Sequence, residues 1–476
     1  MVVLFRSFKL WTERTTLHGV ADLMISRNRA QIVFWAVLLL FGFSTVLANL
    51  YTLLNNFLTP PHYRTSIYVK YKDTMEFPNV TICNLNRVNK TKASEFGLSG
   101  DAISYLFLAF MASPQITTLA FGGMPLLQKQ AAEWSKFVET SPEHASTTDV
   151  LLKLGHQCET TMKVCTFGNV NFDCCRGAVP VINSEFGLCW SLQLPLTASN
   201  ADWPVQLMPG VMWGLQLVIS PNLAEYSRDS FYNNYLEDGV VIAINANPFE
   251  PLYSNPVVVA PGRHARITVQ PESQLTEGTS FSFFPAECVK EAVMKVVQGP
   301  YTREACILDC MQVIMLERCN CTMLSLNADY SACSPSQMVT CIFPMFFPGQ
   351  EGMSREAFEM IENCSKNCKE PCEEVNKIRV TATVAPYPAR SFIPEIASSY
   401  NMTAQQVYEL VMADVYYAER TQQVVQTIEK TPLSELIGNI GGQLGLWLGA
   451  SALTVVQMVY YFLTAVWDEI EERQKK

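Results

Sequence analysis

The stretch Gly438-Asn-Ile-Gly-Gly-Gln-Leu-Gly-Leu-Trp-Leu-Gly-Ala-Ser451 opens the segment that decides the fold. No charged residue occurs between Glu435 and Asp468, a run of 32 residues, and a helix needs only about 20 residues to cross a bilayer. Small residues recur in this run at helical spacings of 4, 3, 4 and 3: Gly438, Gly442, Gly445, Gly449 and Ala452. A helix that faced only lipid would not need a face without bulky side chains. The pattern therefore predicts a membrane helix that packs on identical copies or lines a water path.

A second apolar run, Ile32 to Leu50, lies near the N-terminus. Trp35 and Tyr51 stand near its two ends, as aromatic residues do at membrane interfaces. The alternative is a cleaved signal peptide, whose apolar core would be about 7–15 residues long and close to the first residue. This run is longer and 31 residues precede it. The chain is therefore predicted to span a membrane twice.

Cysteine usage indicates which side of the membrane holds the large middle part. All 16 cysteines lie between Cys83 and Cys372, and confinement to one compartment indicates an oxidising one. Basic residues flanking the first span favour a cytosolic N-terminus only weakly. Between the spans lie five acceptor patterns for N-glycosylation, at Asn79, Asn89, Asn320, Asn363 and Asn401. We therefore expect a plasma-membrane protein with both termini in the cytosol.

These inferences divide the chain into five parts. We expect a cytosolic segment over 1–30, a first transmembrane helix over 31–54, an extracellular domain over 55–430, a second transmembrane helix over 431–467 and a cytosolic tail over 468–476. The tails hold 8 of the 34 basic and 6 of the 44 acidic residues, which leaves 26 and 38 outside, a net charge of −12. Such a domain would enrich cations near a pore mouth, although ordinary solubilising charge explains it equally well.

The extracellular part contains strand-like and helical runs. Pro-Gly pairs at 209–210 and 261–262 mark turns between strands. Strands are predicted over 80–83, 214–219, 240–244 and 265–269, and helices over 302–317 and, interrupted by Pro114, Gly122-Gly123 and Pro125, over 102–132. The predicted fold is an α+β membrane protein with two transmembrane helices and a large disulfide-rich domain.

The spacing of the cysteines is a second signal. Cys306 and Cys310 are four apart on a predicted helix, and Cys364, Cys368 and Cys372 continue the same spacing. Residues four apart share one helical face, so two antiparallel segments could be joined by a ladder of disulfides. A zinc site is the alternative, which the oxidising compartment disfavours. We expect no bound metal.

Several motifs in the chain together resemble the degenerin/epithelial sodium channel family. Trp447-Leu-Gly-Ala-Ser451 with Gly441-Gly442-Gln443 looks like its pore segment, and His18-Gly19 matches its cytosolic His-Gly motif. Phe77-Pro-Asn-Val-Thr-Ile-Cys-Asn84 resembles its first extracellular block, and Tyr301 through Cys321 its cysteine-rich block. The resemblance extends from residue 18 to residue 457.

The resemblance implies a homotrimeric, sodium-preferring channel with palm, β-ball, finger, thumb and knuckle parts, blocked by amiloride-like cations between Gly438 and Gly449. Gly449, Ala450 and Ser451 would form the selectivity filter, where the helix gives way to extended backbone that lines water. Gly438 would lie where three helices meet in the closed state, and His18-Gly19 would act in gating. The chain departs from the family pattern at Gln457, where a carboxylate is usual. The predicted pore and gate comprise Gly438, Gly441, Gly442, Gln443, Gly445 and Gln457.

The resemblance also implies a disulfide pattern. The implied pairs are Cys83–Cys189, Cys158–Cys165, Cys288–Cys372, Cys306–Cys368, Cys310–Cys364, Cys319–Cys341 and Cys321–Cys333. Cys174 and Cys175 fall outside this pattern and either bridge each other or pair elsewhere.

The trigger is predicted from the presumed finger, residues 95–139, which is apolar and contains no histidine. This character is most similar to the branch gated by the peptide FMRFamide, so we expect a short amidated peptide as ligand. Its aromatic groups would bind Tyr105, Phe107, Phe110 and Phe121. The alternatives are that these residues are core, and that the channel is proton-gated or constitutively open.

Other classes of protein fit the sequence less well. An ATP-gated trimer would need a cluster of Lys and Arg, and none is found. A two-span scavenger-type receptor would not need the glycine-rich span. No His-Glu-x-x-His or Gly-x-Ser-x-Gly motif indicates an enzyme. Nothing indicates a nucleic-acid partner or a cofactor, and sodium is the expected permeant ion.

Overall fold

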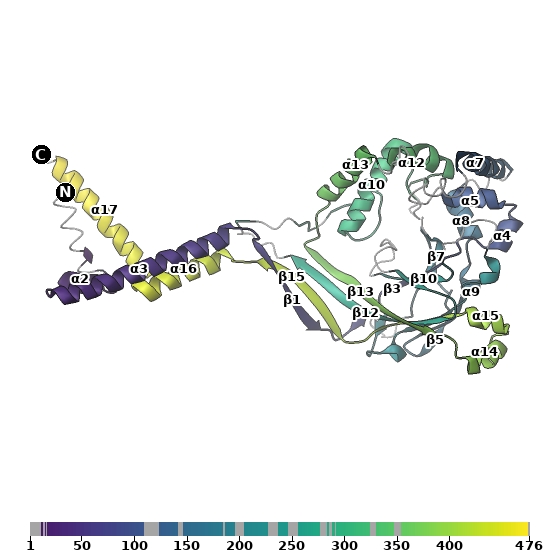
Figure 1. Ribbon diagram of the computed structural model, residues 1–476, viewed down its shortest axis with the longest axis horizontal. Coiled ribbons are helices and arrows are strands. Elements are labelled where there is room, and N and C mark those ends of the chain that lie inside the picture. Colours follow the sequence, from purple (N-terminus) through teal and green to yellow (C-terminus); the bar gives the residue numbers. More distant parts are fainter. Residues whose placement is uncertain are drawn as a thin grey trace. The chain divides into compact units, whose positions relative to one another are not determined.

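The computed structural model describes residues 11–12, 15, 17–108, 123–140, 146–183, 186–195, 204–226, 237–245, 256–276, 283–284, 288–290, 292–323, 330–346 and 354–474. The chain divides into two compact units. The first comprises Met1–Ser66, Glu277–Ala286 and Gln426–Lys476, and the second comprises Ile67–Thr276 and Glu287–Val425. Each unit is described by itself (Figure 1).

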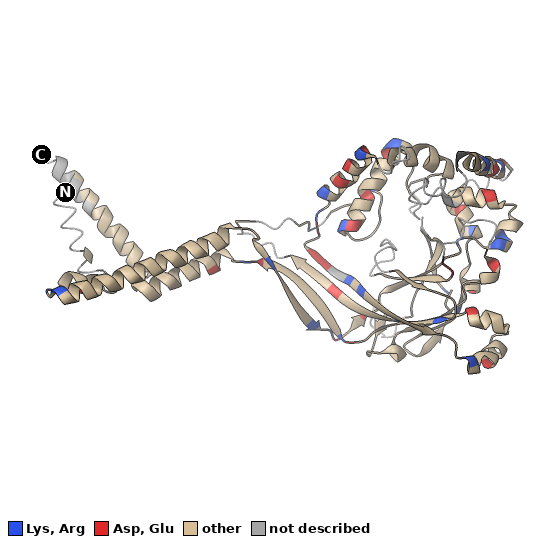
Figure 2. Ribbon diagram, viewed as in Figure 1, with Lys and Arg blue, Asp and Glu red and all other residues tan. Residues whose placement is uncertain are grey.

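The first unit is helical, with α2 (Val20–Ile25), α3 (Arg29–Leu58), α16 (Leu433–Leu448) and α17 (Ala452–Gln474). The side chain of Asn28 caps the start of α3 by accepting a hydrogen bond from the Ala30 amide. The helix ends just before Pro60-Pro61, since proline cannot continue a helix. Figure 2 shows almost no charge along α3 and α16 between their ends.

Among the described residues, α3 alone is long and apolar enough to cross a membrane. Leu433–Leu448 and Ala452–Thr464 pass the same test together, but they are bent by 78° at the break between them, as in a broken span or a re-entrant loop. The helix therefore ends at the small residues 449–451, as predicted. The local conformation is not the expected extended one, since Gly449 has the left-handed φ of 62°.

The second unit is built on two larger sheets and one short pair. An eight-stranded sheet has the order β1-β15-β12-β14-β9-β4-β5, with β13 on β12, and a five-stranded sheet has the order β11-β10-β3-β7-β6. The strands are β1 (Tyr63–Tyr71), β2 (Met75–Glu76), β3 (Asn79–Asn84), β4 (Met162–Phe167), β5 (Val170–Phe172), β6 (Val179–Asn183), β7 (Gly187–Ser191), β8 (Val205–Gln206), β9 (Leu215–Ile219), β10 (Val240–Asn245), β11 (Pro256–Val259), β12 (Arg263–Thr276), β13 (Glu373–Pro386), β14 (Val411–Tyr417) and β15 (Thr421–Glu429).

The predicted strands correspond to β3, β9, β10 and part of β12. Strand β10 is buried along its whole length between β11 and β3, which explains its continuous apolar run. The main core lies between the sheets and is formed by side chains such as Phe167, Leu217, Ile242 and Ile267.

Helices gather in three groups in this unit (Figure 1). The first group contains α4 (Lys90–Glu95), α5 (Gly100–Leu108), α7 (Gly123–Thr140), α8 (Thr147–Leu154) and α9 (Cys158–Thr161). The second contains α10 (Arg303–Cys319), α11 (Pro335–Gln337), η4 (Met338–Ile342), α12 (Phe343–Phe346) and α13 (Arg355–Asn367), and the third contains η5 (Arg390–Phe392), α14 (Ile393–Ser399) and α15 (Ala404–Glu409). Two short 3-10 turns, η2 (Val211–Trp213) and η3 (Leu223–Glu225), flank β9.

Two helix predictions are tested by these bounds. The helix over 302–317 is confirmed as α10, which Thr302 caps and Asn320 ends with a left-handed φ of 55°. Pro125 does not break its helix, because it lies in the first turn of α7, where a missing amide hydrogen costs nothing. Pro114 and Gly122 lie outside the described residues.

All 16 cysteines form eight disulfides, and six of the seven predicted pairs are confirmed. Those six are Cys83–Cys189, Cys288–Cys372, Cys306–Cys368, Cys310–Cys364, Cys319–Cys341 and Cys321–Cys333. The pairs of Cys306 and Cys310 join α10 to α13 as an antiparallel ladder. Cys372 lies beyond the end of α13, so the third rung is not on the helix.

The predicted Cys158–Cys165 pair is wrong. Cys158 bonds to Cys175 and Cys165 bonds to Cys174. The cause is the hairpin of β4 and β5, whose turn at 168–169 has left-handed φ angles of 58° and 65° and carries the following residues back beside Cys165. Spacing alone could not distinguish the three ways to pair four cysteines.

Candidate pore segment and outer pocket

Helices α3 and α16 pack closely in opposite directions. Gly42 and Val46 are the buried residues of α3. A Cβ on Gly42 would lie 3.2 Å from the Trp447 carbonyl oxygen, so the two backbones approach as close as a glycine allows. Farther along α3, the Asn49 side-chain amide donates to Oε1 of Gln443 at 2.8 Å. Polar side chains in apolar helices are costly unless paired, and this bond pairs both amides.

The break between α16 and α17 is held by local hydrogen bonds. The Gly449 amide donates to the Gly445 carbonyl at 3.0 Å, and the Ala450 amide donates to the Leu444 carbonyl at 3.2 Å. On the other side of the break, the Ser451 amide donates to Oγ1 of Thr454 at 3.0 Å. The backbone of residues 449–451 therefore leaves the helix at a defined place.

The His18-Gly19 motif lies against this break. The His18 amide donates to the Leu448 carbonyl at 2.9 Å. A Cβ on Gly449 would lie 2.5 Å from Cγ of the His18 ring, so only glycine fits there. Gly19 has a φ of 79° and precedes α2. The structure thus brings together the predicted gating motif and the first residue of the predicted filter, which are 430 positions apart in the chain.

The remaining predicted pore residues differ in their surroundings. A Cβ at Gly438, Gly441 or Gly442 would meet nothing within 4 Å, so the face is open to a neighbour. Gln443 accepts the hydrogen bond from the Asn49 side chain. Oε1 of Gln457 is buried and has no hydrogen-bond partner among the described residues.

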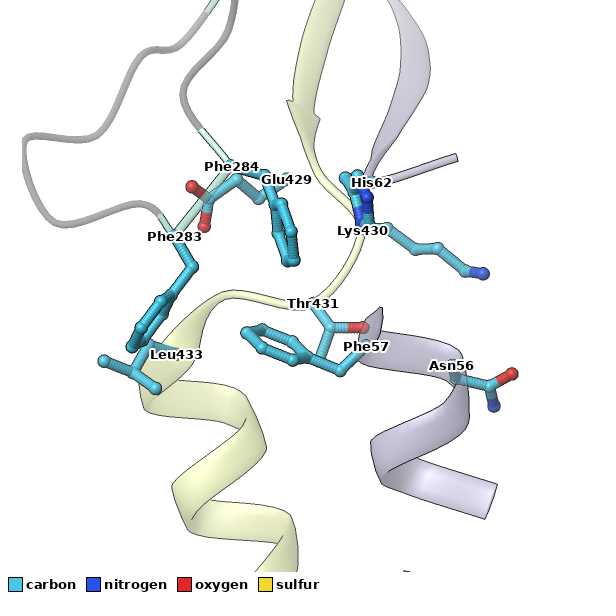
Figure 3. Close-up of a pocket in the computed structure, with 9 residues that line it drawn as sticks. All are labelled: Asn56, Phe57, His62, Phe283, Phe284, Glu429, Lys430, Thr431 and Leu433. Atoms are coloured by element: carbon cyan, nitrogen blue, oxygen red, sulfur yellow. The ribbon is translucent and has the colours of Figure 1, made fainter. Parts of the chain in front are cut away.

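A small pocket lies at the junction of α3, β1, β15 and α16 in the first unit (Figure 3). The His62 ring stacks on Phe284 with centroids 3.7 Å apart and an interplanar angle of 3°. The Phe57 ring lies 5.7 Å from Phe284 and 6.1 Å from Phe283. The lining residues are Asn56, Phe57, His62, Phe283, Phe284, Glu429, Lys430, Thr431 and Leu433.

The structure does not support the predicted peptide contact at Tyr105. Tyr105 is only 4% exposed and belongs to a core cluster with Leu106, Trp134 and Phe137. Burial raises the pKa of its hydroxyl. The aromatic residue is therefore core, which was the alternative reading of this segment. Phe107 lies in α5 and its side chain is not described, and Phe110 and Phe121 lie outside the described residues.

The five glycosylation acceptors are not equally accessible. Asn320, Asn363 and Asn401 are exposed, whereas Asn79 is half-buried in β3. Asn89 is 8% exposed, and its side-chain oxygen caps α4 by accepting from the Lys92 amide at 3.0 Å. The Asn89 side chain is therefore buried and engaged as a helix cap in the folded chain.

Sequence reasoning missed two features of these sites. Asn49 lies in the run Ile32 to Leu50, which is almost wholly apolar, and an amide inside a span indicates a polar partner. The pocket was missed because Phe57, Phe284 and Glu429 come from three distant segments with no shared motif. Among the described residues, no cluster of His, Cys, Asp or Glu could hold a metal ion.

An apolar helix, an apolar helix pair broken at small residues and a disulfide-rich body are the parts of a two-span ion-channel subunit. Comparison with known proteins identifies the family. The family model described as amiloride-sensitive sodium channel matches residues 11–461, and the chain belongs to this family. The resemblance to degenerin/epithelial sodium channels is confirmed. The family comprises sodium channels of the plasma membrane and not enzymes.

The relatives are similar over nearly the whole chain. The bile acid-sensitive ion channel of Mus musculus is 24% identical over 454 residues, which cover 94% of this chain and 86% of that protein. Acid-sensing ion channel 2 of Danio rerio is 22% identical over 98% of this chain and 85% of that protein. Acid-sensing ion channel 4 of Mus musculus is 24% identical over 98% of this chain and 81% of that protein.

Proposed function

We propose that this chain forms a homotrimeric, sodium-selective channel in the plasma membrane, with residues 55–430 outside the cell and both tails in the cytosol. The observation that carries this proposal is the break between α16 and α17 at 449–451, against which His18 packs. Three such breaks around one axis would form a ring of backbone and hydroxyl oxygens. Eight disulfides between Cys83 and Cys372 support the extracellular location of that part.

Selectivity in this proposal rests on Gly449, Ala450 and Ser451. Gly438, Gly441 and Gly442 present a face without side chains, which would let copies of α16 approach one another. Gln457 stands where the family usually has a carboxylate, so local cation attraction would be weaker inside the pore. Amiloride would block from outside, between Gly438 and Gly449.

The trigger in this proposal is an extracellular FMRFamide-like peptide. The apolar character of residues 95–139 suggested such a ligand, and the burial of Tyr105 moves the search for its site elsewhere. A peptide can open the pore only if it binds the open arrangement more tightly than the closed one.

Proton gating is the second candidate, and one observation favours it. Nε2 of His264 lies 2.7 Å from Oδ2 of Asp414, and the two side chains are 14% and 3% exposed. The pair joins the neighbouring strands β12 and β14. Matched relatives are also named for acid or bile acid sensitivity.

Voltage-clamp recording tests these proposals. Cells that express the full chain are exposed in turn to FMRFamide, to acidification and to a bile acid, each with and without amiloride. The proposal predicts a peptide-evoked inward sodium current that amiloride blocks. Current evoked only by acid would replace the peptide with the proton as the trigger.

A further inference from the structure

The turn between α14 and α15 presents an asparagine to solvent. Asn401 is exposed and has a φ of 50°, a left-handed conformation that asparagine adopts more readily than most residues. A backbone hydrogen bond fixes the turn, since the Met402 amide donates to the Ala397 carbonyl at 2.9 Å. Both helices lie at the periphery of the second unit (Figure 1). The Asn401 side chain is therefore held in an accessible position.

Thr403 completes the acceptor pattern that begins at Asn401, and it also shapes the fold. Its side chain caps α15 by accepting from the Gln406 amide at 3.3 Å, and Oε1 of Gln406 accepts from the Thr403 amide at 2.9 Å. Thr403 is exposed as well. The asparagine and the hydroxyl residue of this pattern thus both lie on the surface.

Two of the other acceptor patterns contain a cysteine as the central residue. These patterns begin at Asn320 and Asn363, and the cysteine of each forms a disulfide. Attachment of a sugar there competes with closure of the disulfide at the next residue. Thr322, the hydroxyl residue of the first pattern, is only 1% exposed. These two asparagines are therefore weaker candidates than Asn401.

The two remaining patterns begin inside the fold. Asn79 is half-buried in β3, the middle strand of its sheet, and Asn89 is 8% exposed and caps α4. A glycan is bulky and belongs at the surface. It is attached before the chain folds, so a chain modified at Asn89 could not bury that residue afterwards. The folded protein is therefore expected to carry no glycan at Asn89.

We propose that Asn401 carries an N-linked oligosaccharide and that Asn89 does not. In the transfer, Nδ2 of Asn401 bonds to the anomeric carbon of the first sugar and loses one proton, while the bond from that carbon to the pyrophosphate of a lipid-linked donor breaks. The sugar follows directly on Tyr400, which is 49% exposed, and gives this part of the surface a hydrophilic cover. The proposal rests on the extracellular location of residues 55–430 proposed above.

Mass spectrometry of the full chain, purified from animal cells, tests the assignment directly. An amidase removes the glycans and converts each modified asparagine to aspartate. Asn401 is expected to be read as aspartate and Asn89 as asparagine. This measurement uses the wild-type chain, so it does not depend on the folding of a variant.

Electrophoretic mobility of three variants gives a second readout. Thr403→Val removes the acceptor hydroxyl and is expected to lose the shift of one glycan. Thr403→Ser keeps both the acceptor pattern and the helix cap, and it should migrate as wild type does. The control Asn89→Gln should also migrate as wild type does.

The outcomes separate this site from the location on which it rests. An unmodified Asn401 or a modified Asn89 overturns the assignment. The location is tested on intact cells with a membrane-impermeant amine reagent, which is expected to label Lys366 on α13, whose side chain is 67% exposed. If Lys366 is labelled and Asn401 is unmodified, the site fails and the extracellular location stands. Failure to label Lys366 contradicts the location itself.

Discussion

The hydrogen bond between Asn49 and Gln443 is predicted to set the balance between closed and open channels. It joins α3 to α16 at 2.8 Å, two turns before the break at Gly449. Interhelical hydrogen bonds in membranes contribute about 0.6 kcal/mol on average and up to about 1.7 kcal/mol. If only one gating state makes the bond, its loss shifts the open-to-closed ratio about 3- to 18-fold, since about 1.4 kcal/mol corresponds to tenfold.

A double-mutant cycle measures this contribution. Asn49→Leu and Gln443→Leu are each expected to shift the ratio in the same direction, and the double variant is expected to shift it no further. Exchange of the two residues, Asn49→Gln with Gln443→Asn, should restore the wild-type ratio. The matched control is Thr52→Val, because the Thr52 hydroxyl bonds only within α3, to the Ala48 carbonyl. Single-channel open probability is the readout, with thermal unfolding of the solubilised protein as a ligand-independent one. Additive effects of the two Leu substitutions would refute the coupling.

Three further predictions concern other sites. Gly449→Ala should reduce current at least tenfold, because its φ of 62° is strained for alanine by about 1–2 kcal/mol and its Cβ would strike the His18 ring. Adding His18→Ala should restore part of that current. Asp309→Asn should lower the melting temperature of the protein, because the Asp309 carboxylate accepts hydrogen bonds from the backbone amides of Lys295, Val296 and Val297 at 3.0, 2.6 and 2.8 Å. The control Glu317→Gln, on the exposed side of α10, should leave the melting temperature unchanged. Burial lowers the pKa of His156 from 6.5 to about 4, so the folded protein favours the neutral imidazole. The free energy of unfolding is therefore expected to fall as the pH falls from 6.5 towards 4, by about 3 kcal/mol over the whole range. Melting curves of wild type and His156→Gln between pH 7 and pH 5 check this, and equal pH dependence of the two would contradict it.

Features that depend on local spacing were predictable from the sequence. The spacing of four between Cys306 and Cys310 places both on one face of α10, so a ladder of disulfides was possible from the sequence. The partners of these cysteines and the end of α16 at 449–451 were implied instead by the resemblance to the family.

Features that depend on the meeting of distant segments were not predictable. The partner of Gln443 is set by the rotation of α3 about its axis, which places Asn49 and Gly42 toward α16. Tyr105 was assigned to a ligand because its segment is apolar, but an apolar face also suits a core, and here it packs with Trp134. The pairing of Cys158 depends on a hairpin turn that the spacing did not reveal.

The central claim is that residues 449–451 form a sodium-selective filter. Its most direct test is the reversal potential of the current through the full chain, with sodium outside and potassium inside the cell. The current is recorded in wild type and in the Gly438→Phe variant, which should stay open without ligand. The account predicts a current that reverses at positive potentials and that a thiol-reactive cation blocks in Ser451→Cys but not in Ser399→Cys. A current carried by chloride, or one that is equally insensitive to the reagent in both cysteine variants, would contradict it.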